Sequence, residues 1–121
     1  MADILIIEDD ITLQKVYREI LTQKGYTVSV AGTGQDGLQL LKTTSISLIL
    51  LDIMLPGGLN GFDVLAQIKR DEQYKNIPVI ILSNLDTEKQ TAFDYGAADY
   101  FFKVNMDLRS LVEKINHLLP A

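Results

Sequence analysis

The polar residues of this sequence that suit metal and phosphate chemistry stand directly after short apolar runs. They are Glu8, Asp9 and Asp10 after one run, Asp52 after another, and Ser83 and Lys103 after two more. Carboxylates held within a few ångströms repel one another and raise each other's pKa unless a cation lies among them. Mg²⁺ prefers oxygen ligands and commonly binds through one or two carboxylates together with phosphate and water. If the fold gathers these runs, the sequence therefore predicts a Mg²⁺ site beside a phosphate.

Five apolar runs, rich in β-branched residues, alternate with longer amphipathic stretches. The runs predict strands at residues 4–7, 27–31, 48–51, 79–82 and 100–102. Three of them are apolar almost throughout rather than alternating, which is typical of strands buried on both faces of a parallel sheet.

The stretches between the runs have helical periodicity. The first and last helices are predicted by apolar stripes made of Leu13, Tyr17, Ile20 and Leu21, and of Leu108, Leu111, Val112, Ile115 and Leu119. Thr33 with Asp36, and Asn60 with Asp63, have the spacing of a capping box and predict where the second and third helices begin. The fourth helix, expected around residues 87–95, has the weakest stripe.

Strict alternation of strands and helices predicts one α/β domain over residues 1–121. Right-handed crossovers give a doubly wound five-stranded parallel sheet, a flavodoxin-like (βα)5 fold with strand order 2-1-3-4-5. In such sheets ligands bind at the carboxyl ends of the strands, near the switch in strand order. The acidic run of the first strand and Asp52 of the third are then neighbours.

Composition excludes several other classes of protein. A formal charge of -5 argues against direct nucleic-acid binding, and the absence of cysteine excludes disulfides and thiolate zinc sites. The first apolar run is too short for a signal peptide or a membrane span, so we expect a cytoplasmic protein with no membrane partner. His117, the only histidine, is expected on the surface of the last helix, so the chain has no phosphohistidine of its own.

A simpler role is open for part of the acidic run. Asp9 or Asp10 could cap the helix that follows, and for Asp10 this is the favoured interpretation. Capping does not account for Asp52 one strand away, nor for Ser83 and Lys103 at the same edge of the sheet.

Four segments, taken in order, resemble the receiver domain of two-component response regulators. They are residues 4–10 (ILIIEDD), 50–56 (LLDIMLP), 79–83 (VIILS) and 96–103 (GAADYFFK). No single segment is specific, but the joint pattern covers nearly the whole chain.

The resemblance implies roles for the acidic residues. Asp52 would accept a phosphoryl group from a histidine kinase or a phosphotransfer protein. Asp9 and Asp52 would ligate Mg²⁺, with Glu8 acting through a water molecule and the main-chain carbonyl of Met54 as a further ligand.

The resemblance also implies how the signal is passed on. Ser83 would hydrogen-bond the phosphoryl group, Lys103 would pair with it, and Tyr100 would be a switch residue that moves inward. The output partner would be a downstream effector protein or an appended output domain. The chain would assist its own phosphorylation and dephosphorylation without being an enzyme for an external substrate.

Two features depart from the pattern of that family. Val104 stands where receivers usually have a proline after the lysine, so a trans peptide bond or a strained loop is expected and the reach of Lys103 is open. The loop after Asp52 is one residue longer than the usual form. Its two adjacent glycines, Gly57 and Gly58, are expected to make it flexible.

Two rival functions stay open on the sequence. A receiver-like docking module that is never phosphorylated is supported by Val104. A haloacid-dehalogenase-like phosphohydrolase would use Glu8-x-Asp10-x-Thr12, although glutamate puts the nucleophile one methylene too far out.

Overall fold

The computed structural model describes residues 3–104 and 106–119, so residues 1–2, 105 and 120–121 of the predicted domain lie outside the described part. In chain order the elements are β1 (Asp3–Ile7), α1 (Ile11–Gln23), β2 (Thr27–Ala31), α2 (Gly34–Thr43), β3 (Leu48–Asp52), α3 (Gly61–Arg70), β4 (Val79–Ser83), α4 (Lys89–Asp94), β5 (Asp99–Phe102) and α5 (Leu108–Leu118). The predicted alternation of strands and helices is confirmed.

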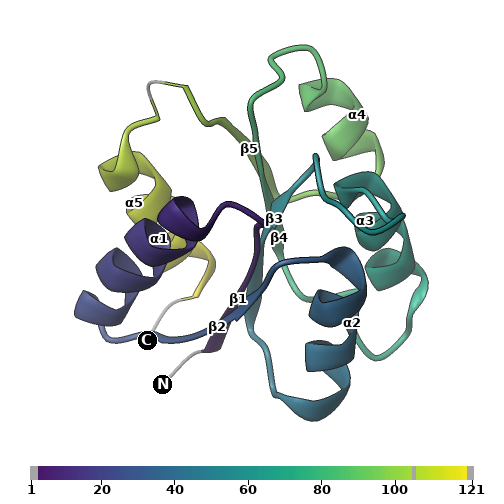
Figure 1. Cartoon of the computed structure of the whole chain (residues 1–121), viewed down its shortest axis with the longest axis horizontal. Helices are drawn as coiled ribbons and strands as arrows, with labels where there is room; N and C mark the ends of the chain where they lie inside the picture. Colours follow the sequence, from purple (N-terminus) through teal and green to yellow (C-terminus); the bar gives the residue numbers. More distant parts are fainter. Residues whose placement is uncertain (1–2, 105, 120–121) are drawn as a thin grey trace.

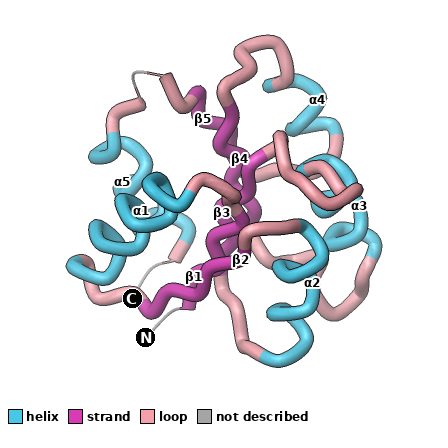
Figure 2. The backbone as a smooth tube through the Cα atoms, viewed as in Figure 1, coloured by secondary structure: helices cyan, strands magenta, loops and turns pink. Residues whose placement is uncertain are grey.

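The strands form one parallel sheet in the order β2-β1-β3-β4-β5, as predicted. Helices α1 and α5 cover one face of the sheet, and α2, α3 and α4 cover the other (Figure 1). The strands form the central layer between these two groups of helices (Figure 2). All residues of β3 and β4 are buried, which explains why both sequences are apolar up to their last residues, Asp52 and Ser83.

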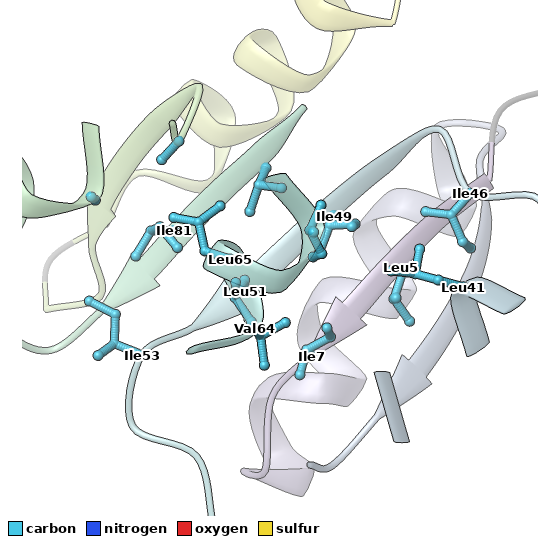
Figure 3. Packing of buried hydrophobic residues seen from close by; sticks show 14 of the residues in the cluster. Leu5, Ile7, Leu41, Ile46, Ile49, Leu51, Ile53, Val64, Leu65 and Ile81 are labelled. Carbon is cyan, nitrogen blue, oxygen red and sulfur yellow. The ribbon is translucent and has the colours of Figure 1, made fainter. Parts of the chain in front are cut away.

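Successive side chains of each strand enter two separate hydrophobic clusters, one on each face of the sheet. Leu5 and Ile7 of β1 belong to the cluster under α2, α3 and α4, whereas Ile4 and Ile6 belong to the cluster under α1 and α5. Figure 3 shows the first cluster, in which Leu5 and Ile7 lie near residues of β3, α2 and α3. Both faces of the sheet are therefore core.

Helices α2 and α3 begin at the predicted caps, Thr33 and Asn60. The Asn60 side chain accepts a bond from the Asp63 amide and the Asp63 side chain returns one, a complete capping box. Thr33 accepts a bond from the Asp36 amide at 3.1 Å. Helix α4 (Lys89–Asp94) is shorter than the predicted range 87–95. Glu88 at its start makes no side-chain cap bond, and Ala92 is the residue of the helix that is buried.

The third and fourth strands each run one residue further than predicted, into Asp52 and Ser83. Parallel pairing continues there, since Asp52 pairs with Leu82 and Ser83 with Phe102. Among the described residues every peptide bond is trans, including the one after Lys103. Within residues 3–104 and 106–119, none of the helices has both the length and the apolar character needed to cross a membrane.

Gly61 provides a test of how tightly α3 packs against the end of β3. A Cβ atom at this position would lie 2.3 Å from the Asp52 carbonyl oxygen and 2.6 Å from the Ile53 Cα, both rigid main-chain atoms. Gly61→Ala should therefore lower the free energy of unfolding by about 2–3 kcal/mol in urea denaturation.

Gly32→Ala is the matched control for that substitution. A Cβ atom at Gly32 would meet only the end of the Gln14 side chain, at 3.9 Å. Its effect should stay within about 0.5 kcal/mol. Equal effects of the two substitutions would contradict the close packing at Gly61.

Candidate functional site

The sheet register brings the predicted site residues to one edge. Ile7, the last residue of β1, pairs with Leu51 of β3, so Glu8 and Asp52 follow on neighbouring strands. On the other side of β3, β4 ends at Ser83, one residue beyond the partner of Asp52. Because the strands are parallel, these side chains gather where the strand order reverses.

Three carboxylates meet at this edge and could hold a metal ion. Glu8, Asp9 and Asp52 each offer one oxygen, and these oxygens lie within 4.8 Å of one another. Glu8 and Asp52 are only 2% and 5% exposed, whereas Asp9 is exposed. The cluster is therefore closed on its inner side and open to solvent at Asp9. A set made only of oxygen donors suits a hard divalent cation.

Lys103 follows β5 and reaches this cluster across the end of β4. Its ammonium nitrogen lies 3.1 Å from Oδ2 of Asp52 and also donates to Oε1 of Glu8. The Lys103 side chain is 7% exposed, so both ion pairs are largely removed from water. Val104 in place of the usual proline does not prevent the lysine from reaching the acidic residues.

Burial and charge shift the ionisation of this group of residues. Burial raises the pKa of Glu8 to about 7, although the hydrogen bond from Lys103 opposes the rise. Burial disfavours the charged form of Lys103, but the bond to Glu8 and the charge of Asp52 outweigh it and raise the pKa of the ammonium group. Lys103 therefore keeps its proton, and Glu8 is the carboxylate whose charge is hardest to maintain.

Several main-chain and side-chain bonds fix the orientation of Glu8. Its amide donates to the Ala31 carbonyl at 3.0 Å, and its Oε2 accepts from the Asp10 amide at 3.1 Å. The Gln14 side-chain amide donates to the Glu8 carbonyl. The role of Gln14 was not predicted from the sequence. Its only signal was a polar side chain on the first turn of the helix that follows the acidic run.

The two aspartates after Glu8 have different environments. Asp10 caps α1, since its Oδ1 accepts from the amides of Thr12 at 2.9 Å and Leu13 at 3.2 Å. Asp9 belongs to the carboxylate cluster. The capping interpretation of Asp10 is therefore confirmed, and the phosphohydrolase motif loses the aspartate that it needs.

Ser83 and Tyr100 are joined through the main chain of a single residue. The Ser83 oxygen accepts a hydrogen bond from the Leu85 amide at 3.0 Å, and the Tyr100 hydroxyl donates to the Leu85 carbonyl. Ser83 and Tyr100 are both buried. Because the Leu85 amide uses Ser83 as an acceptor, the serine hydroxyl hydrogen is free to be donated to another group.

Met54 and Tyr17 adjoin the carboxylate cluster, whereas His117 is on the last turn of α5. Met54 is 63% exposed, and its amide donates to Asp52 Oδ1 at 3.4 Å. Burial, assisted by the charge of Glu8, raises the pKa of Tyr17 to about 12 and keeps its hydroxyl neutral. His117 is exposed on α5, as predicted.

Comparison with known proteins finds a matching family model and curated relatives of the same kind. A family model described as the response regulator receiver domain matches residues 4–116. The protein PilH of Pseudomonas aeruginosa is 36% identical, with all of both chains covered. The transcriptional regulatory protein AfsQ1 of Streptomyces coelicolor is 39% identical over 85% of this chain and 45% of its own length.

A solved structure shows the same fold. It is the response regulator protein TrrA of Thermotoga maritima in complex with Mg²⁺-BeF, with a TM-score of 0.88 and 26% identity over 98% of this chain and all of that one. Several curated relatives are much longer than this chain, which spans about half of their length or less.

The raised pKa of Glu8 predicts how the stability of the metal-free protein depends on pH. The ordinary value is 4.5 and the folded value is about 7, so between these values the folded state binds a proton that the unfolded state releases. The free energy of unfolding should therefore fall as pH rises from about 4.5 to about 7, by at most about 3 kcal/mol.

Glu8→Gln removes this titration and is the variant to compare with the wild type. Urea denaturation in a chelator at about pH 5 and about pH 8 should show the variant gaining on the wild type at the higher pH. A difference between the two proteins that does not vary with pH would show that Glu8 does not carry the effect.

Proposed function

The chain belongs to the response regulator receiver domain family, and we propose that Asp52 is the residue on which it accepts a phosphoryl group. The observation that carries the proposal is the environment of this carboxylate. Asp52 is buried at the edge of the sheet, grouped with Glu8 and Asp9, and lies 3.1 Å from the Lys103 ammonium group.

Mg²⁺ is the proposed cofactor. The carboxylates of Asp9 and Asp52 would ligate it, Glu8 would hold one of its water molecules, and the Met54 carbonyl would be a further ligand. The oxygen-only donor set and the spacing of the three carboxylates support this assignment. The complex of TrrA with Mg²⁺-BeF supports it further, because that relative has the same fold. When bound, the ion would supply positive charge for the phosphoryl oxygens.

The residues of the chain have distinct tasks in phosphoryl transfer. An Asp52 oxygen attacks phosphorus in line with the bond to the donor imidazole, whose nitrogen keeps the electron pair and takes up a proton. The product is an acyl phosphate on Asp52. Lys103, already in contact with the Asp52 carboxylate, compensates the negative charge on the transferred group. Glu8 and Asp9 supply the negative charge that attracts the cation.

Ser83, Leu85 and Tyr100 form the proposed switch. In the unphosphorylated protein the Ser83 oxygen accepts a bond from the Leu85 amide. When the Ser83 hydroxyl donates to a phosphoryl oxygen, the serine shifts, and the Leu85 amide shifts with it. The Leu85 carbonyl is bonded to the Tyr100 hydroxyl, so the shift reaches β5 and the surface near α4. Phosphorylation would then change the surface near α4 although the phosphoryl group makes no contact with Tyr100.

The proposed phosphoryl donor is a histidine kinase or a phosphotransfer protein, and the proposed output is a downstream effector protein or an output domain on a longer chain. With such a donor the chain would act in the cytoplasm. Beyond its own phosphorylation and hydrolysis it would have no external substrate. The unphosphorylated docking module loses its main support, since Lys103 contacts Glu8 and Asp52 despite Val104.

Phosphorylation from acetyl phosphate tests the acceptor. The wild type should gain one base-labile and hydroxylamine-labile phosphoryl group by mass spectrometry, and a chelator should abolish the gain because the cation is lost. Asp52→Asn should fold and accept none. It should also be more stable than the wild type without Mg²⁺, because one repelling charge is gone.

Asp36→Asn is the control, because Asp36 is an exposed aspartate in the first turn of α2. This variant keeps Asp52 and should therefore gain one phosphoryl group, like the wild type. Labelling of Asp52→Asn to the wild-type level would exclude this residue as the acceptor. Loss of metal-free stability in Asp52→Asn would contradict the repulsion among the carboxylates.

The switch is tested with beryllofluoride, a phosphoryl mimic, and Mg²⁺. In the wild type and in Ser83→Thr, NMR signals of the Leu85 amide and the Tyr100 ring should shift, because a hydroxyl at position 83 can donate to the mimic. Ser83→Ala should bind the mimic while the shifts at Leu85 and Tyr100 are lost. If Ser83→Ala kept both shifts, the route through Leu85 would be wrong.

A further inference from the structure

We propose that Gln35 is a positioning residue of the acidic site, because its side-chain amide fixes the loop that carries Met54. The inference rests on the proposed function, since the Met54 carbonyl matters only if a cation binds beside Asp52. It concerns a residue on a different helix, outside the carboxylate cluster and outside the switch.

The loop between β3 and α3 is fixed at its base. The Gly61 amide donates to the Ile53 carbonyl at 2.7 Å, and the capping box of Asn60 and Asp63 closes the start of α3. The tip is less constrained by its own sequence. Gly57 and Gly58 are exposed there, with φ angles of 87° and 95°. Adjacent glycines have the most conformational freedom to lose, so the tip needs a contact from outside the loop to hold one conformation.

Gln35 supplies that contact. Its Nε2 donates to the Gly57 carbonyl at 2.5 Å, and a Cβ atom on Gly57 would lie 3.3 Å from its Oε1. Gln35 is the second residue of α2, just after the Thr33 cap. Next to it, Gly34 packs so closely that a Cβ atom would lie 3.1 Å from the Cβ of Leu59 in the same loop. The start of α2 is therefore a rigid support for the tip.

A displacement at Gly57 is passed to Met54 through a stiff segment. Pro56 has a fixed φ angle, and Leu55 before it is restricted to extended conformations. Leu55 also packs against the core. The Met54 amide is bonded to the Asp52 carboxylate at 3.4 Å, so the same displacement reaches the proposed acceptor. Mg²⁺ demands near-ideal octahedral geometry, which makes its affinity sensitive to such a change.

Calorimetric titration of the metal-free protein with MgCl₂ tests the role of Gln35. Gln35→Met keeps the length of the side chain but cannot donate, and Gln35→Ala removes the side chain altogether. Both should weaken Mg²⁺ binding by about tenfold, the lower end of the effect of groups that orient metal ligands. Both should leave the thermal midpoint of the metal-free protein unchanged, while amide exchange at Gly57, Gly58 and Met54 becomes faster.

Gln39→Ala is the matched control, an exposed glutamine one turn further along α2, and it should bind Mg²⁺ like the wild type. Wild-type affinity in both Gln35 variants would overturn the inference. So would a loss in Gln35→Ala that Gln35→Met does not share, since packing rather than the amide would then be responsible. Absence of Mg²⁺ binding in the wild type itself would overturn the proposed function and the inference together.

Discussion

Three carboxylates share one edge of the sheet with a single ammonium group, and this excess of negative charge determines the character of the site. Glu8 and Asp52 are buried, so water screens them poorly, and Lys103 can neutralise only part of their charge. Burial, with a smaller contribution from the charge of Asp52, raises the pKa of Glu8. A cluster of oxygen donors of this kind suits a hard divalent cation.

The sheet imposes this arrangement on the carboxylates. Neighbouring parallel strands fix where Glu8 and Asp52 leave the sheet, and both strands are buried on both faces. Burying one large aliphatic side chain contributes about 1.5–3 kcal/mol, and β3 alone buries four. The packing energy therefore exceeds a repulsion of a few kcal/mol, and the carboxylates cannot move apart by shifting the strands. The repulsion among the carboxylates therefore remains in the folded protein.

Much of this arrangement could be predicted from the sequence, because buried parallel strands and capped helices leave local patterns. The apolar runs predicted the strands. The rule that ligands bind at the switch in strand order predicted that Glu8, Asp9 and Asp52 lie close together. The end of β3 was one residue off, because pairing with β4 has no local signal. Gln14, Leu85 and Gln35 were missed, since each acts through main-chain groups, which any residue type has. Gln14 bonds the nearby Glu8 carbonyl, whereas Gln35 and Leu85 meet Gly57 and Tyr100 from distant segments. For the same reason the sequence left the reach of Lys103 open.

The two hydrophobic clusters lie on opposite faces of the sheet, and within the strands they are separated by the main chain. Tyr100 belongs to the cluster under α2, α3 and α4, whereas the next residue, Phe101, packs against the cluster under α1 and α5. One face can therefore be repacked while the other keeps its shape. Over evolutionary time, substitutions beneath α4 can alter how readily that face responds, without a matching set of substitutions beneath α1 and α5.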